Sequence, residues 1–293
     1  MKITRILAAS LSSCLLTCAC VAAPIQVVDD RGRTISLPGP PQRIVSTAPS
    51  NTEILYALGL ANRVVGVSEY SNYPSEARKK PTVGSVSLSY ERILSLKPDL
   101  VVAFWGLQKA NVLRLERLGV RVLAIDPKNV ADVLHAVSLV GAATGSQKQA
   151  ARVVAGMTAK LKRAAAALKR AHGRPRALWV IATNPQILAA GPHTFMDDVL
   201  RRAGGVNVAA DLPSQFPSLS QEAAIARRPE VLITSAPEWS KDLAGRPAWR
   251  SVPAVKSRRF FSPPPDITER PGPRLADAVL MLARFLHPEA SRP

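Results

Sequence analysis

Apolar residues recur every three or four positions between Ser146 and Ala171, a period typical of a helix with one buried face. The apolar positions are Val153, Val154, Met157, Leu161, Ala164, Ala165 and Leu168. The other face of the predicted helix carries the basic residues Lys160, Lys162, Arg163, Lys169 and Arg170. Glycines at 145 and 173 break the pattern on either side. The sequence therefore predicts one long amphipathic helix of about 39 Å, at a rise of 1.5 Å per residue.

A sequence repeat flanks this predicted helix. The segment Ser89–Val102 matches Ser220–Ile233 at one constant offset, which pairs Glu91 with Glu222. Each copy predicts a serine N-cap, a short helix ended by proline, and then a buried strand. The repeat indicates two similar α/β lobes, one on each side of the long helix.

Strand and helix patterns alternate in both halves, which favours doubly wound parallel sheets. We therefore predict an α/β fold of two doubly wound lobes with parallel sheets, joined by one long connecting helix. The expected boundaries are a signal peptide over 1–22, an N-terminal ligand-binding lobe over 23–145, the connecting helix over 146–172 and a C-terminal ligand-binding lobe over 173–293. A leading hairpin is expected over 25–37, and Ser50–Glu53 is typical of a helix-starting capping box.

The first residues predict export. Lys2 and Arg5 precede an apolar run from Ile6 to Leu16 and then small residues, which is typical of a secretory signal cleaved after Ala22 or Ala23. All three cysteines lie inside this segment, so the mature chain would have no disulfide. A lipid anchor on Cys18 or Cys20 is the alternative, although the residues before each form a poor lipobox. We expect a periplasmic protein.

The formal net charge of +18 is large for 293 residues. Such an excess can mark a nucleic-acid-binding protein. Here the basic residues are scattered, aromatic residues are few, and no nucleic-acid-binding motif is present. We expect no nucleic acid partner and interpret the charge as a weak attraction to an anionic membrane surface.

Motifs for catalysis are missing from the sequence. It has no glycine-rich phosphate fingerprint, nucleophile elbow or zinc-type cysteine pair after the predicted signal. The four histidines are far apart and lack the spacing of metal ligands on a helix. The expectation is a protein that is not an enzyme, with no catalytic residue, no metal and no cofactor of its own.

Aromatic residues follow several predicted strands. They are Tyr70, Tyr73, Phe104, Trp105 and Phe216. Ligands of open α/β sheets bind outside the carboxyl ends of the strands, and aromatic walls suit a large, flat, amphipathic ligand. The alternative is that some of these rings simply cover the edges of the lobes.

Four segments resemble the periplasmic solute-binding proteins of ABC importers that have a rigid helical backbone (class III), and most closely the vitamin B12 (cobalamin) binders. They are Gly66–Pro74, Ser89–Gly106, Phe216–Ile233 and Ile267–Arg274. The resemblance implies a monomer that binds cobalamin or a related corrinoid and delivers it to an ABC permease dimer in the inner membrane. Cobalamin would then be the transported ligand, not a cofactor.

The resemblance also implies roles for individual residues. Tyr70, Phe104 and Phe216 would line the corrin cleft, and Glu269 would contact the ligand. We expect the ring of Trp105, which directly follows Phe104, to face the same cleft. Glu91 and Glu222 would dock onto the permease, although a carboxylate in a first helical turn also stabilises the helix without any partner.

The chain departs from the cobalamin pattern at three positions. Ser85 stands where a tryptophan is expected, Phe104 replaces a tryptophan, and Ile267 replaces a frequent aromatic residue. A haem or ferric-siderophore binder of the same fold is therefore the alternative, and for haem an axial ligand could come from Tyr70, Tyr73 or His193.

Overall fold

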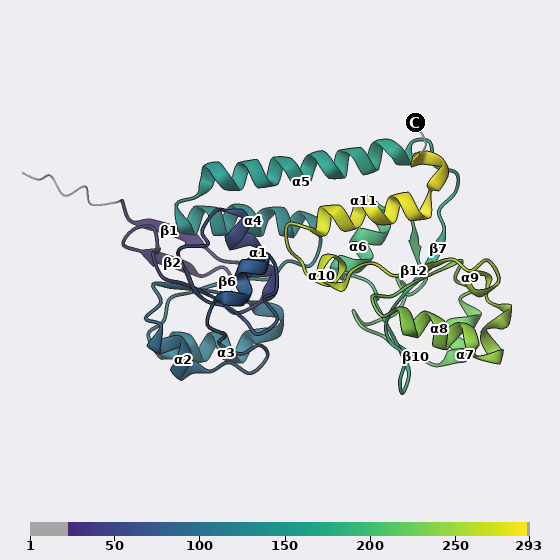
Figure 1. Cartoon of the computed structure of the whole chain (residues 1–293), viewed down its shortest axis with the longest axis horizontal. Helices are drawn as coiled ribbons and strands as arrows, with labels where there is room; N and C mark the ends of the chain where they lie inside the picture. The colour runs from purple at the N-terminus through teal and green to yellow at the C-terminus, as the bar shows by residue number, and fades with distance from the viewer. Residues whose placement is uncertain (1–22, 292–293) are drawn as a thin grey trace, which may run out of the picture.

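The computed structural model describes residues 23–291. Two lobes lie side by side beneath one long helix, α5 (Gln147–Leu168) (Figure 1). The predicted signal peptide, with its cysteines, lies outside the described residues. Within 23–291, no helix combines the length and hydrophobicity needed to cross a membrane.

The N-terminal lobe contains a parallel four-stranded sheet in the order β4-β3-β5-β6. Its strands are β3 (Ile44–Ser46), β4 (Val64–Gly66), β5 (Leu100–Phe104) and β6 (Val122–Ile125). The helices are α1 (Pro49–Ala57), α2 (Tyr90–Ser95), α3 (Trp105–Arg117) and α4 (Val130–Thr144). The predicted leading hairpin is confirmed, since β1 (Ile25–Val28) pairs antiparallel with β2 (Thr34–Leu37).

The C-terminal lobe contains a mixed sheet in the order β10-β8-β7-β11-β12, with β9 also paired to β7. The strands are β7 (Arg176–Ala182), β8 (Ile187–Ala189), β9 (Val206–Asn207), β10 (Ser218–Leu219), β11 (Val231–Ile233) and β12 (Phe260–Phe261). Strands β8 and β10 run antiparallel to their neighbours, whereas the sequence predicted parallel strands throughout. The chain returns from β7 to β8 through a short turn, and a short turn can join only antiparallel neighbours.

Six helices accompany this second sheet. They are α6 (Phe195–Arg202), α7 (Gln221–Ala226), α8 (Pro237–Gly245), α9 (Pro253–Lys256), α10 (Pro265–Thr268) and α11 (Leu275–Leu286). The short α10 carries the chain back toward the N-terminal lobe, and α11 then runs beneath α5 (Figure 1). The segment just before α11 therefore lies against α1 and the loop after β4.

The sequence repeat is a structural repeat. Ser89 and Ser220 each accept a hydrogen bond from the backbone N–H three residues on, as the N-cap prediction requires. The backbone then turns left-handed at equivalent positions, with φ of 45° at Lys97 and 48° at Arg228. Both copies therefore end their helix in the same way before the following strand begins.

The predicted capping box at the start of α1 is wrong. The helix begins at Pro49, and its N-cap residue, Ala48, has no capping side chain. Proline suits the first helical position because its φ is already helical and its missing N–H would have no partner there. Ser50 and Glu53 consequently lie inside the helix, which leaves Glu53 free to contact the C-terminal lobe.

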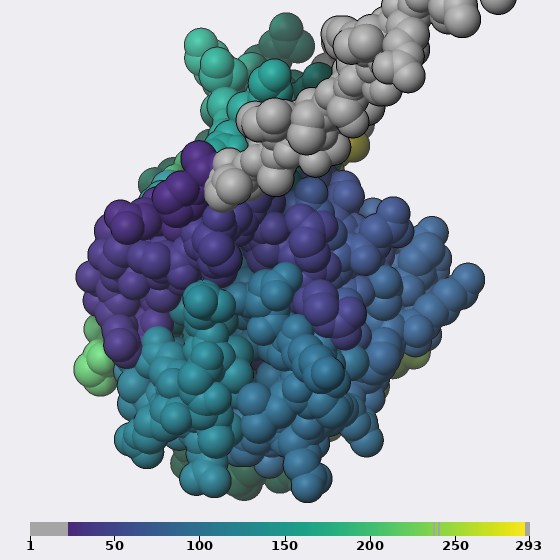
Figure 2. All heavy atoms as spheres, turned by 90° about the vertical axis from the view of Figure 1, so that its left-hand side faces the viewer, coloured from purple at the N-terminus to yellow at the C-terminus, as the bar shows by residue number. Residues whose placement is uncertain are grey.

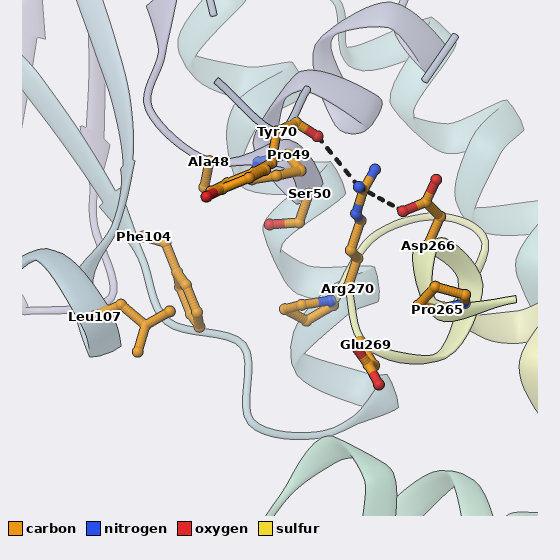
Figure 3. Close-up of a pocket in the computed structure, with 11 residues that line it drawn as sticks. Ala48, Pro49, Ser50, Tyr70, Phe104, Leu107, Pro265, Asp266, Glu269 and Arg270 are labelled. Carbon is orange, nitrogen blue, oxygen red and sulfur yellow. Dashed lines mark hydrogen bonds and ion pairs between the residues drawn. The ribbon is translucent and has the colours of Figure 1, made fainter. Parts of the chain in front are cut away.

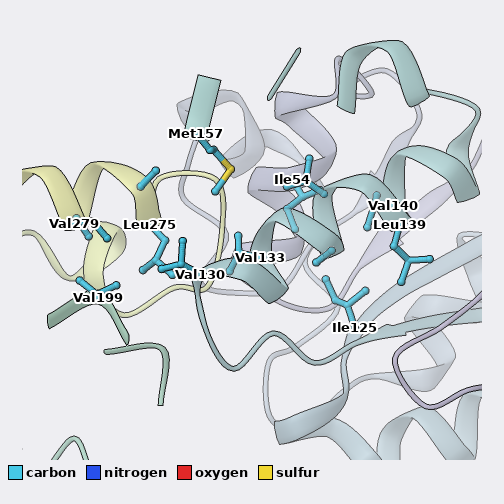
Figure 4. Close-up of a cluster of buried hydrophobic side chains, with 14 of the residues drawn as sticks. Ile54, Ile125, Val130, Val133, Leu139, Val140, Met157, Val199, Leu275 and Val279 are labelled. Atoms are coloured by element: carbon cyan, nitrogen blue, oxygen red, sulfur yellow. The ribbon is translucent and has the colours of Figure 1, made fainter. Parts of the chain in front are cut away.

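The long helix is confirmed and does more than connect. It packs on both α4 and α11 with a buried stripe of Ala150, Met157 and Ala164. Figure 4 shows Val133 of α4 and Met157 of α5 in the same apolar cluster as Leu275 of α11. One hydrophobic core therefore runs from the first lobe into the second beneath α5.

Candidate functional site

A cavity of about 290 Å³ lies where the two lobes meet. The N-terminal lobe contributes residues 48–50 at the β3–α1 junction, Tyr70 after β4, and Phe104 and Leu107 at the β5–α3 junction. The opposite side comes from α10 and the turn before α11, namely Pro265, Asp266, Glu269, Arg270 and Pro271. Figure 3 shows the two sets of side chains facing each other.

A smaller apolar pocket of about 140 Å³ adjoins this cavity and shares Tyr70, Phe104 and Leu107 with it. It adds Ser85 and Val86 from the loop before α2. Tyr70, Val86 and Leu107 are 63%, 74% and 71% exposed, respectively, so large apolar groups gather here in contact with solvent. Such a patch at a cavity marks a surface that a ligand would cover.

Gln108 fixes the shape of the apolar wall, which is formed by Tyr70, Val86, Phe104 and Leu107. Its side chain is buried; Oε1 accepts a hydrogen bond of 2.6 Å from the Thr47 hydroxyl, and Nε2 donates to the carbonyl oxygens of Thr47 and Ser85. The backbone of Gln108 is non-helical, with φ of −126°, so α3 is kinked directly after Leu107. The buried amide therefore ties the loop of the smaller pocket to the β5–α3 junction. The sequence pattern of α3 contained no signal for this role.

Arg270 joins the two sides of the cavity. Its guanidinium donates to Asn72 Oδ1 at 2.7 Å and forms an ion pair with Glu53. It also donates to the Tyr70 carbonyl at 3.2 Å and forms an ion pair with Asp266 (Figure 3). Arg270 therefore holds the loop that presents Tyr70. We did not predict it as a site residue, although it directly follows Glu269 in the segment that carries the family resemblance.

The structure brings three of the predicted ligand-binding residues together. Tyr70 and Phe104 line the cavity from the N-terminal lobe, and Glu269 lines it from the other side. Glu269 is exposed, and one of its carboxylate oxygens accepts a hydrogen bond from the Ser235 hydroxyl. These contacts place an acidic group opposite an apolar wall.

Trp105 and Phe216 do not line either pocket. The Trp105 ring lies under the guanidinium of Arg31, 5.1 Å from ring centroid to Cζ, and packs on the core of its own lobe. Phe104 and Trp105 are consecutive residues where a strand becomes a helix, so their side chains leave the backbone in different directions. Phe216 is 48% exposed in the loop before β10.

The other candidates for a haem ligand also lie outside the cavity lining. The Tyr73 ring stacks beneath Arg274, 3.8 Å from ring centroid to Cζ, and His193 is exposed in a loop. Among residues 23–291, no group of three His, Cys, Asp or Glu side chains is arranged to hold a metal ion.

Glu91 and Glu222 are exposed in the first turns of α2 and α7. A hydrogen bond from its own backbone N–H, together with one from the Ser220 hydroxyl, lowers the pKa of Glu222. These contacts agree with a helix-capping role, which needs no partner protein. They also leave the carboxylate exposed, so that a partner protein could still contact it.

Two α/β lobes with a shared helical core and a cavity at their junction are the architecture of a solute-binding protein with a helical backbone. Residues 44–267 match the family model of the periplasmic binding proteins, and the chain belongs to this family. Its members are solute-binding transport proteins of ABC importers, not enzymes. The predicted family, fold class and non-enzymatic role are therefore confirmed.

Individual relatives differ in ligand. The chain is 32% identical to the vitamin B12-binding protein of Vibrio cholerae, over 86% of this chain and 91% of the relative. It is similar to the crystal structure of the V. cholerae periplasmic vitamin B12-binding protein BtuF, with a TM-score of 0.73, 28% identity and coverage of 87% and 99%. It is similar to the same degree to the apo periplasmic heme-binding protein RhuT of Roseiflexus, with a TM-score of 0.77, 29% identity and coverage of 85% and 99%.

Proposed function

We propose that this protein captures cobalamin or a related corrinoid in the cleft between its lobes. The observation that carries the proposal is the exposed apolar wall of Tyr70, Val86, Phe104 and Leu107 facing the polar side chains of Glu269 and Arg270. A corrin ring has flat apolar faces and amide groups around its edge, so one face would cover the wall while the edge meets polar groups. The two pockets are small, so they would bury a face of the ligand and leave part of it outside.

Delivery completes the proposal. The protein would act as a periplasmic monomer after removal of its signal peptide and would dock on a dimeric ABC permease. Glu91 and Glu222 occupy equivalent places in the two lobes, and a two-fold symmetric permease could receive both through paired arginines.

Haem is the second candidate, and a specific residue favours it. Tyr70 is the one proposed axial ligand that lines the cavity, and its phenol is largely exposed there. A ferric siderophore belongs to the same alternative, since the cavity also contains the cationic Arg270.

Calorimetric titration with cyanocobalamin, haemin and a ferric siderophore tests the proposal directly. We expect tight binding of cyanocobalamin, and we expect Tyr70→Phe to retain it because the ring remains. Tight binding of haemin that Tyr70→Phe abolishes, with no response to cyanocobalamin, would replace the corrinoid by haem.

A further inference from the structure

The outward face of α5 and its C-terminal end carries two groups of cations in one line, here together called the basic stripe. It consists of Lys148, Arg152, Lys162, Arg163, Lys169 and Arg170. All six are exposed. At 3.6 residues per turn they fall within a sector of about 120°, opposite the buried residues of the helix, and extend over about 33 Å.

Carboxylates do not neutralise the basic stripe. The sequence from 146 to 172 contains no Asp or Glu. In the part of the chain that the structure describes, none of the six side chains forms an ion pair, whereas Lys160 on the flank of α5 lies 2.7 Å from Asp277. The six charges therefore act together on whatever approaches this face.

The stripe has no apolar side chain with which to insert into a bilayer. The exposed residues between the cations include Ala155, Gly156, Ala159 and Ala166, all of them small. The apolar face of α5 is already packed on α4 and α11. A membrane-embedded amphipathic helix would need that face free, so α5 can bind only to a surface and only by charge.

The stripe lies at the opposite edge of the molecule from the proposed docking residues. α5 forms the upper edge in Figure 1, and α2 and α7, which begin with Glu91 and Glu222, lie along the lower edge. In the end-on view of Figure 2, teal atoms of this part of the chain stand above the first lobe. A partner can therefore cover the stripe while Glu91 and Glu222 stay accessible.

We propose that the basic stripe binds the surface of an anionic phospholipid bilayer through electrostatic attraction, with the lower edge of the lobes turned away from that bilayer. A straight row of cations matches a flat sheet of anionic headgroups in both charge and shape. Small residues between the cations let the helix approach the headgroups closely. The bound molecule would keep its lobes and docking residues facing the aqueous space.

Vesicle co-sedimentation tests this proposal with the exported protein. The probes are vesicles of phosphatidylcholine alone and of phosphatidylcholine mixed with phosphatidylglycerol. We expect binding only to the vesicles that contain phosphatidylglycerol, and weaker binding as salt rises, because the Debye length falls to about 8 Å at physiological ionic strength. Replacing all six stripe residues by glutamine should weaken this binding at least tenfold.

A matched variant distinguishes the effect of the basic stripe on vesicle binding from the effect of the overall net charge. It replaces six exposed cations elsewhere by glutamine, namely Lys79, Arg117, Arg121, Lys241, Arg250 and Lys256. Both variants lose the same charge, and circular dichroism melting checks that both fold. The proposal requires the matched variant to retain vesicle binding within about threefold.

Two results would overturn the proposal. Equal loss in both folded variants would assign the binding to net charge. Binding of the parent protein to soluble poly-glutamate but not to vesicles would assign the stripe to an acidic polymer.

Discussion

Glu53 and Arg274 join the two lobes by a two-point ion pair. Arg274 Nε donates to Glu53 Oε2 at 2.8 Å, and Nη2 donates to Oε1 at 2.6 Å. The Glu53 side chain is only 2% exposed. Burial alone would lower the pKa of Arg274, but the hydrogen bonds and charge of Glu53 outweigh it and raise that pKa. Glu53 belongs to α1 and Arg274 directly precedes α11, so this pair fixes the C-terminal segment on the N-terminal lobe.

Glu53→Gln should destabilise the protein. The substitution leaves Arg270 and Arg274, both partly buried, without a shared carboxylate, and breaking such a pair costs about 3 kcal/mol. Urea unfolding measures this loss. The control is Asp242→Asn, which breaks the exposed pair with Arg246 and should cost less than about 1 kcal/mol. Equally small losses in both variants would contradict a structural role for Glu53.

Phe104→Ala should weaken binding of cobalamin by about 1–3 kcal/mol, because one stacked ring of the apolar wall is lost. Calorimetry measures the change, and Leu113→Ala on the helix that follows Phe104, α3, is the control because Leu113 lies outside both pockets. Unchanged affinity in Phe104→Ala would remove this wall from the site. The same titration on Phe216→Ala tests whether the loop before β10 contacts the ligand.

Ligand binding should change the angle between the lobes only slightly. The apolar core continues from Val133 through Met157 to Leu275, and the Glu53–Arg274 pair adds a second connection. Small-angle scattering curves with and without cobalamin should therefore nearly superimpose. A marked contraction would show that the lobes close about a flexible hinge.

Tyr56→Phe should stabilise the protein by up to about 1 kcal/mol, because the buried Tyr56 hydroxyl lacks a hydrogen-bond partner among the described residues. Burial, helped by the Glu76 carboxylate, raises the pKa of Tyr56 above its usual value of about 10. The raised pKa contributes stability below pH 10 that is lost as pH rises through the folded-state pKa, so the variant should also lose less stability in alkali.

Tyr90→Phe is the control, and it should change the free energy of unfolding in the opposite direction. The Tyr90 hydroxyl donates to Asn111 Oδ1 at 2.6 Å, so its removal should destabilise the protein by about 1 kcal/mol. Chemical denaturation at neutral and alkaline pH compares the two variants. Destabilisation by Tyr56→Phe would mean that its hydroxyl does find a partner.

Glu91→Ala combined with Glu222→Ala should leave cobalamin affinity intact and reduce both uptake and stimulation of the permease ATPase. The reason is that both carboxylates are exposed, at equivalent places in the two lobes and away from the cavity lining. Glu76→Ala combined with Glu238→Ala removes the same charge elsewhere and should not affect transport. Normal transport by the first variant would restrict both glutamates to helix capping.

Sequence patterns predicted those elements that depend only on contacts between residues close together in the chain. The three- and four-residue period of α5 and the serine caps at 89 and 220 depend on neighbours within one or two turns, and the structure confirms them. The family resemblance predicted a shared ligand site for Tyr70, Phe104 and Glu269, and all three line one cavity. It did not predict Leu107 and Gln108, because a buried amide that bonds distant carbonyls leaves no periodic signal.

That one face of α5 is apolar and the other basic follows from side-chain spacing along a helix, and the sequence alone predicts it. What the apolar face packs against, and that the stripe faces solvent, depends on how the lobes pack together. The tertiary structure likewise determines that Phe104 faces the cavity while its neighbour Trp105 lies under Arg31, and that Glu53 pairs with Arg274 instead of capping its own helix. Such contacts join residues far apart in the chain, and spacing along the sequence contains no information about them.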